Sequence, residues 1–188
     1  TLIQGISSRI ENATDSLVIA TYLGPAMVPI YSIPANLTGH VRGIGMSLTH
    51  VFMPIFSNLT SQKNQQCKIK NTYLSGSKFV IGIILLRSTG IVMLGADFIE
   101  IWIGDTLTNN NTRAIVWGLT LFITIPMLNP FCSRYLTATN QHGIFAKLAP
   151  ISAVLNLSIS IILVTKIGIL GVVIGSLIPV SLFTHLFK

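Results

Sequence analysis

The sequence predicts an all-α polytopic membrane protein with six transmembrane helices. Hydrophobic residues make up 51% of the 188 positions and charged residues only 9%, whereas about 25% of residues are charged in ordinary soluble domains. The mean hydropathy is +0.72, and apolar runs recur along the whole chain. Such runs favour transmembrane helices, because a helix in lipid satisfies its backbone polar groups internally.

Short polar segments and glycine or proline turns divide the apolar runs into six. The first turn is Gly24-Pro25, where glycine favours the end of one helix and proline the start of the next. A single span over residues 16–35, straight through this turn, is the alternative to two helices. The expected helices cover residues 2–23, 27–59, 72–103, 112–139, 144–164 and 168–187.

The third and fourth expected helices carry features that are unusual inside a membrane span. The central part of the third, residues 79–96, is apolar apart from Arg87 and its Ser-Thr neighbours. This helix ends near Trp102, an expected interfacial anchor, and Gly104, an expected helix stop. In the fourth helix, Pro126 and Pro130 predict a kink that neighbouring helices can accommodate.

The last two expected helices carry small and polar residues that suit packing within a bundle. Ser152, Asn156 and Ser160 are spaced to share one face of the fifth helix. We expect Asn156 and Ser160 to form hydrogen bonds between helices rather than to bind a ligand. In the sixth helix, Gly171 and Gly175 form a small-xxx-small pattern that lets two helix backbones approach closely.

The basic residues predict how the helices are oriented in the membrane. The net charge is +7, but the basic residues are too dispersed, and too poor in interleaved aromatic residues, for a nucleic-acid interface. Their distribution follows the positive-inside rule, which places both ends of the chain in the cytoplasm. The expected cytoplasmic loops contain Lys63, Lys68, Lys70 and Lys147, and the expected outer loops contain Arg113 and Lys166.

The second expected helix has two different faces over residues 33–55. Helical periodicity gathers apolar side chains on one arc and small or polar side chains on the rest of the circumference. We expect the apolar arc to face lipid and the polar face to line protein or a wet cavity. Arg42 lies near the middle, where an arginine needs a partner, water or a ligand. The arc contains Leu37, Val41, Ile44, Leu48 and Val51, and the polar face contains Asn36, His40, Gly43, Ser47 and His50.

The sequence contains no signature of catalysis, metal binding or cofactor binding. It has no nucleophile elbow, no HExxH motif, no P-loop and no acidic pair in a loop. Cys67 and Cys132 lie far apart and belong to no CxxC or Cys/His cluster, so they predict neither a disulfide framework nor a metal site. We therefore expect a protein that is not an enzyme and that needs no cofactor.

Three segments resemble parts of one known family, in the same order and spacing. The segment DSLVIATYLGPAMVPIYSIPANL (15–37) has an acidic residue before a Val/Ile-rich run, then Leu-Gly and Tyr-Ser. FIEIWIG (98–104) resembles the end of a later helix, and residues 140–179 carry a polar turn, an Asn-Leu pair and a Gly-Ile-x-Gly-Val-x-x-Gly pattern. Together they resemble the oligosaccharide/polysaccharide transporters, a branch of the MATE-like (multidrug/oligosaccharidyl-lipid/polysaccharide) exporters.

This resemblance implies two six-helix lobes around a central cavity, with this chain as the C-terminal lobe. Because the sequence starts at Thr1 without a methionine, we expect a piece of a longer protein with twelve to fourteen helices. The implied function is the translocation, by alternating access, of an oligosaccharide carried on an isoprenoid diphosphate across the cytoplasmic membrane of a prokaryote. The implied partners are the lipid bilayer, this lipid-linked substrate, the N-terminal lobe, and a glycan polymerase or glycosyltransferases.

The resemblance also suggests roles for the charges within the spans. A diphosphate head group is polyanionic, and arginine offers a permanent charge with a forked donor set that matches phosphate oxygens. Arg42 and Arg87 are therefore candidate head-group ligands, with a structural ion pair to Glu11 or Asp15 as the alternative. Glu11 and Asp15 are themselves candidates for ion coupling or for pairing with an arginine. The candidate cavity-lining residues are Asn36, His40, Ser47 and His50, with hydrogen-bonded packing as the alternative for the two histidines.

Other functions remain open at this point. A cation-coupled multidrug exporter of the same superfamily would favour acidic and aromatic residues toward the cavity, whereas the mid-span charges here are basic. A non-catalytic membrane partner of an envelope-glycan synthesis complex is a further alternative. A membrane-embedded enzyme is disfavoured by the lack of catalytic loops, and a channel by the lack of a repeated filter-like element.

Overall fold

The structure, a computed structural model, describes residues 13–61, 66–104, 111–129, 131 and 143–186. All regular secondary structure in these residues is helical, which confirms the all-α prediction. A helical segment at residues 13–22 comes first in the described chain. It is followed by the short 3₁₀ helix η1 (Pro25–Met27) and by α2 (Val28–Ser61), α3 (Gln66–Ile103), α4 (Thr112–Met127), α6 (Gly143–Ile167) and α7 (Ile169–Leu186).

The described helices include one, α3, that is long and apolar enough to cross a membrane by length and composition. Its 38 residues exceed the roughly 20 that span the hydrocarbon layer. Shorter apolar helices are formed by α4 and by residues 151–167 and 169–182 of α6 and α7. With the low content of charge, these features identify an all-α membrane protein.

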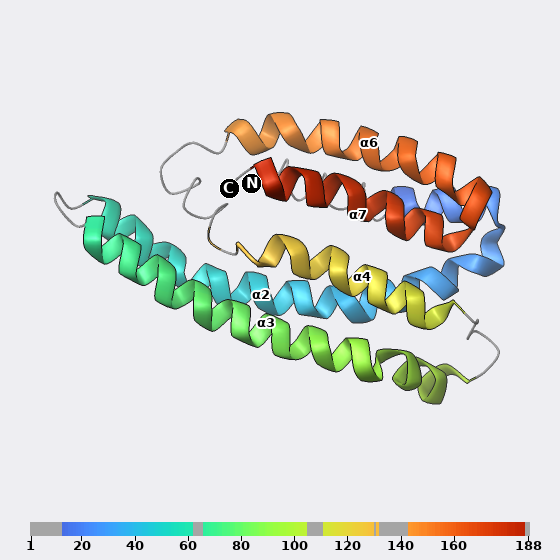
Figure 1. The fold of residues 1–188 in the computed structure, drawn as a ribbon, viewed down its shortest axis with the longest axis horizontal. Helices are drawn as coiled ribbons and strands as arrows, with labels where there is room; N and C mark the ends of the chain where they lie inside the picture. The colour runs from blue at the N-terminus through green and yellow to red at the C-terminus, as the bar shows by residue number, and fades with distance from the viewer. Residues whose placement is uncertain (1–12, 62–65, 105–110, 130, 132–142, 187–188) are drawn as a thin grey trace.

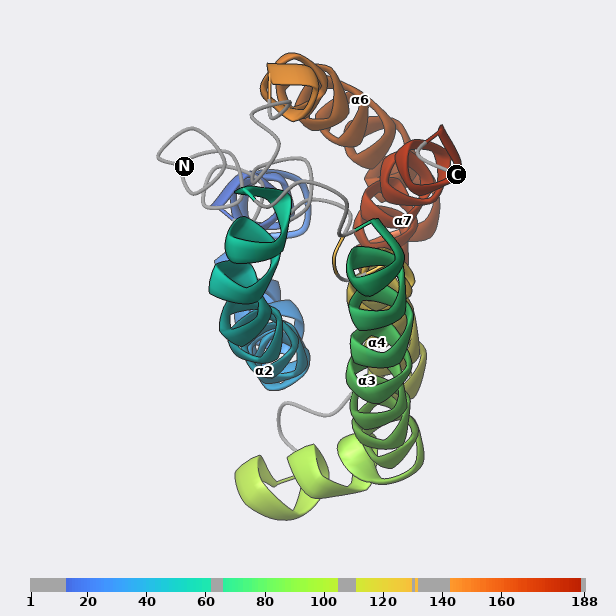
Figure 2. The ribbon, with the colours of Figure 1, turned by 90° about the vertical axis from the view of Figure 1, so that its left-hand side faces the viewer.

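The helices pack side by side, and two of them, α2 and α3, form a long antiparallel hairpin (Figure 1). Helix α4 packs against both members of the hairpin, α7 packs against α4, and α6 packs against α7. In the view of Figure 2, α3, α4, α7 and α6 follow one another along an arc, with α2 beside them. One end of the hairpin, which carries the start of α3, extends past the ends of the other helices (Figure 1).

Glycines in the left-handed region mark the ends of elements, and two of them, Gly24 and Gly104, are at positions where we expect a break. Gly24 has a φ of 94°, Gly104 of 83° and Gly168 of 67°, conformations that side chains with a Cβ rarely adopt. Pro25 occupies the first position of η1, where its missing N–H needs no partner. The chain therefore breaks at Gly24-Pro25, which confirms two helices rather than one span over residues 16–35.

The hairpin is longer than the sequence pattern predicts, because polar residues extend both of its helices. Helix α2 continues to Ser61 and α3 begins at Gln66, whereas we expected ends at residues 59 and 72. The stretch QCKIKN (66–71), expected in a loop, is helical. Glutamine and lysine are good helix formers, and a polar segment can remain helical where it leaves the hydrocarbon layer.

Helix α4 ends at Met127, so the expected helix over 112–139 is not continuous. Leu128 and Asn129 lie outside the helix, and their N–H groups donate to the carbonyls of Ile125 and Pro126. Proline disfavours the helical conformation of the residue before it, and Asn129 precedes Pro130. Helix α4 therefore ends between the two prolines, and the rest of the expected span lies largely outside the described residues.

Two hydrophobic clusters form the core. The first joins residues 13–22 and the start of α2 to α4, α6 and α7. The second fills the space between α2, α3 and the end of α4, with aromatic rings in edge-to-face contact at 4.9 Å and 5.4 Å between centroids. The first contains Val18, Ile19, Tyr31, Ile115, Leu119, Val164, Ile169, Val172 and Val173, and the second contains Val41, Phe56, Val80, Ile84, Ile123 and Phe131.

Helices α6 and α7 approach each other as closely as the glycine pattern predicts. A Cβ added to Gly175 would lie 2.9 Å from Cα of Ser160, and one added to Gly171 would collide with the backbone carbonyl of Leu163. The small-xxx-small face is therefore confirmed as a packing face.

Candidate functional site

Arg42 lies on α2 and turns toward α4. Its side chain is half-buried, and Cζ of the guanidinium is 5.5 Å from the centroid of the Phe122 ring on α4. The electron-rich face of an aromatic ring attracts a cation at this distance without neutralising its charge. The structure thus holds a positive charge beside the α2–α4 interface.

Arg87 lies on α3, and its side chain is exposed. A Cβ on Gly45 of α2 would lie 3.1 Å from Cδ1 of Ile84 on α3, which marks a point where the two antiparallel helices meet. Arg42 and Arg87 are each three residues from this contact, in the same direction along the hairpin. The two arginines therefore lie at the same level of the α2–α3 pair.

The four candidate cavity-lining residues share one exposed face of α2. We call this set, Asn36, His40, Ser47 and His50, the open polar face. Around Gly39 and Gly43, which lie along the same side, an added Cβ would have no atom within 4 Å. The hydroxyl of Ser47 donates to the backbone carbonyl of Gly43 at 2.9 Å. All four residues lie on the surface of the bundle.

The apolar arc of α2 does not have the expected orientation. Val41 is 2% exposed within the second hydrophobic cluster, Leu48 packs against that cluster, and Leu37 lies near Gly95 of α3. Most of the arc thus packs against α3 and α4 instead of facing lipid. The same apolar residues would suit an arc that faces lipid and one that packs in the bundle, because both surroundings are apolar.

Asp15 is buried, with 3% of its surface exposed. The sequence suggests an arginine as its pairing partner, and the structure places two hydroxyl groups beside its carboxylate. The hydroxyl of Tyr31, on α2, donates to Oδ2 of Asp15 at 2.7 Å. The hydroxyl of Ser176, on α7, approaches the same oxygen at 3.1 Å. Asp15 thereby connects three elements: the segment 13–22, the start of α2, and α7.

The contacts of Asp15 continue into α6. The side-chain amide of Asn156 donates to Oγ of Ser176 at 3.1 Å, and the hydroxyl of Ser160 donates to the amide oxygen of Asn156 at 3.3 Å. Both α6 residues are buried. The bond from Asn156 to Ser176 joins α6 to α7, as expected, whereas the bond from Ser160 to Asn156 lies within α6. We call the whole set, Asp15, Tyr31, Asn156, Ser160 and Ser176, the buried polar network.

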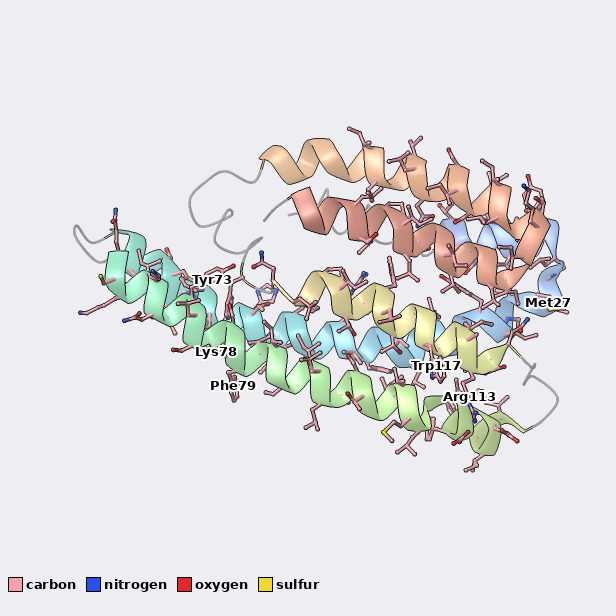
Figure 3. All side chains as sticks on the ribbon, in the orientation of Figure 1. Met27, Tyr73, Lys78, Phe79, Arg113 and Trp117 are labelled. Carbon is pink, nitrogen blue, oxygen red and sulfur yellow. The ribbon has the colours of Figure 1, made fainter. Side chains whose placement is uncertain are left out.

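Further polar contacts tie α3 to α4 along their shared length. Ser88 and Thr124 share a buried hydrogen bond of 2.8 Å, and the hydroxyl of Tyr73 donates to the side-chain carbonyl of Asn129. Near the other end, Arg113 forms an exposed ion pair with Asp97 at 3.1 Å. Figure 3 shows Tyr73 on α3, and Arg113 with its neighbour Trp117 on α4 where it runs beside α3.

Some predictions concern residues that the structure does not describe. Glu11, Lys63 and the second half of the expected helix 112–139 lie outside the described residues. Among the described residues, no group of three or more His, Cys, Asp and Glu side chains is placed to hold a metal ion.

Comparison with known proteins gives one distant relative along the chain. No protein-family model matches, and no solved structure matches. Among curated proteins, the chain is 22% identical over 186 residues to the "Probable low-salt glycan biosynthesis flippase Agl15" of Haloferax volcanii. The match covers 98% of this chain and 39% of that protein, so the chain spans about two fifths of its relative's length. This similarity supports, at most, a distant relationship to a probable glycan biosynthesis flippase.

Proposed function

We propose that this chain is the C-terminal lobe of a MATE-like flippase that moves a lipid-linked oligosaccharide across the cytoplasmic membrane of a prokaryote. The observation that carries the proposal is the similarity to a probable glycan biosynthesis flippase over 98% of the chain. Since that relative is more than twice as long, a second lobe of similar size fits the remainder. In this arrangement the chain contributes six membrane-spanning helices, with both ends in the cytoplasm.

The two arginines support an anionic substrate. An oligosaccharide on an isoprenoid diphosphate carries its negative charge on two linked phosphates, which need cations inside the membrane. Arg42 and Arg87 lie at the same level of the α2–α3 pair, and a guanidinium can bind phosphate oxygens through two N–H groups at once. In the proposal they bind the diphosphate while the sugar lies along the cavity.

The open polar face supports a cavity between two lobes. Asn36, His40, Ser47 and His50 are exposed on the surface of this bundle, and polar side chains rarely face hydrocarbon. The N-terminal lobe would stand opposite this face of α2, with water and substrate between the two. Alternating access then consists of opening this cavity first to the cytoplasm and later to the outside. A glycan polymerase or glycosyltransferases would supply or consume the substrate.

Complementation of a flippase-deficient strain with the complete protein tests the proposal. Wild type should restore surface glycan, and Arg42→Gln or Arg87→Gln should reduce it at least about tenfold, the effect of losing a charge-assisted bond to phosphate. Arg113→Gln is the matched control, because Arg113 is exposed and paired with Asp97. It should retain full export.

Other outcomes would contradict the proposal. Export that persists in both Arg42→Gln and Arg87→Gln, at unchanged protein level, would show that the arginines do not bind the substrate. A wild-type protein that restores no glycan but extrudes cationic dyes would be a multidrug exporter.

A further inference from the structure

The end of the α2–α3 hairpin that extends past the other helices is basic and exposed. Lys68, Lys70 and Lys78 of α3 all have exposed side chains. No aspartate or glutamate occurs between Asp15 and Asp97, and Asp97 is near the opposite end of α3. Within the described residues, this end of the hairpin therefore carries positive charge only.

The length of α3 places these lysines at and beyond the membrane surface. At about 1.5 Å per residue the helix is nearly twice as long as the ~30 Å hydrocarbon layer, so about half of it lies outside. The apolar run of α3 begins at Phe79, which is 60% exposed. Lys78 thus lies at the edge of the hydrocarbon layer, and Lys70 and Lys68 lie roughly 12–15 Å further along the axis.

The end of α4 explains why the lysines are accessible. Tyr73 donates to Asn129 just after α4 ends at Met127, so α4 no longer covers α3 at Lys68 and Lys70. Leu74 and Phe79 are exposed near Lys78. Exposed apolar side chains next to a lysine suit the membrane interface, where the aliphatic stem can lie against lipid while the ammonium reaches a head group.

We propose that this end of the hairpin, with Lys68, Lys70 and Lys78, binds the head groups of anionic phospholipids. Basic side chains close to a transmembrane helix are attracted to anionic lipids, and the attraction falls off within about a Debye length of roughly 8–10 Å. Lys78 then contributes most, because it lies at head-group level, and Lys68 contributes least. This site is separate from the proposed substrate site, since it lies at the end of the hairpin that extends past the other helices.

Cys67, which is exposed at this end of α3, provides a position for a probe. The complete protein, with its other cysteines replaced by serine, is labelled there with a fluorophore and reconstituted into phosphatidylcholine vesicles. Each preparation contains a small fraction of either phosphatidylglycerol or phosphatidylcholine that bears a quencher. We expect the quencher on phosphatidylglycerol to act at least about twofold more strongly at low salt, and this preference to vanish near 0.5 M NaCl.

Substitutions identify the lysines that cause the preference. Fluorescence of the triple variant Lys68→Gln/Lys70→Gln/Lys78→Gln should be quenched equally by both labelled lipids. Among the single variants, Lys78→Gln should lose the largest part of the preference for phosphatidylglycerol. Lys166→Gln is the matched control, because Lys166 is an exposed lysine at the end of α6, and it should keep the preference. Equal quenching in the wild type overturns the proposal, and so does a preference that survives in the triple variant. Loss of glycan export in the triple variant, with no lipid preference in wild-type vesicles, would indicate an acidic protein partner instead.

Discussion

The buried polar network and the open polar face place similar side chains in opposite surroundings. In the network, Asp15 is 3% exposed and accepts hydrogen bonds from Tyr31 and Ser176, and Asn156 continues the chain of contacts into α6. On the open polar face, Asn36 and His40 are exposed on the surface of α2. Both groups belong to helices of a membrane protein.

The difference separates polar residues that hold the helices together from polar residues that lie exposed on the surface of the bundle. A buried polar group is tolerated only when protein partners satisfy it, and the network provides these partners across four elements. An exposed polar face on a membrane helix needs water, a ligand or another protein surface instead. The network should therefore control stability and the open face should control transport.

Replacement of Asp15 should have the largest effect on stability. Asp15→Leu leaves the buried hydroxyl of Tyr31 without its acceptor and should lower the free energy of unfolding by about 2–4 kcal/mol. Asp15→Asn keeps one acceptor oxygen and should lower it by only about 1 kcal/mol. Thermal unfolding of the complete protein in detergent measures both.

The matched control for this prediction is another carboxylate. Asp97 pairs with Arg113, and the two side chains are 53% and 64% exposed. Exposed ion pairs contribute roughly 0–1 kcal/mol, so Asp97→Asn should scarcely change unfolding. If Asp15→Leu unfolds at the wild-type temperature, the network does not hold the helices together.

Two glycines provide a second contrast, with effects of opposite sign. Gly175→Ala would bring a Cβ to 2.9 Å from Cα of Ser160, so α6 and α7 must separate, and the free energy of unfolding should fall by about 1–3 kcal/mol. Gly43→Ala meets no atom within 4 Å and should raise it by about 0.5–1 kcal/mol, the helix preference of alanine over glycine. Unfolding in detergent compares the two variants, and a stabilising Gly175→Ala would contradict the close packing.

Features of single helices and turns could be predicted from the sequence. The breaks at Gly24, Gly104 and Gly168 follow from local backbone preferences, and such preferences depend on neighbours in the chain. The spacing of Asn156 and Ser160 likewise indicated one buried face of one helix. These predictions needed no knowledge of which helices pack together.

Contacts between distant helices could not be predicted in the same way. Ser176 is 161 residues from Asp15 in sequence, and nothing in either pattern specifies that they meet. The sequence pattern predicts that the apolar arc of α2 faces lipid, but apolar residues suit lipid and a protein core equally, so the pattern cannot distinguish the two. The packing of Val41 of α2 with Ile84 of α3 in one cluster shows that this part of the arc belongs to the core. The common level of Arg42 and Arg87 follows from the pairing of α2 with α3, which the spacing of the two arginines in sequence does not specify.

The smallest effect on stability is expected on the open polar face, where the effect on transport should be large. Asn36→Leu and Ser47→Leu replace exposed polar groups with apolar ones and should change the free energy of unfolding by less than about 0.5 kcal/mol. Thr89→Leu is the matched control, because Thr89 is exposed on α3 and donates to the carbonyl of Leu85 as Ser47 does to that of Gly43. If the face lines the cavity, glycan export should fall severalfold in the two α2 variants and persist in Thr89→Leu. Export that persists in all three would mean that this face contacts neither substrate nor cavity water, and that stability and transport both depend on residues elsewhere.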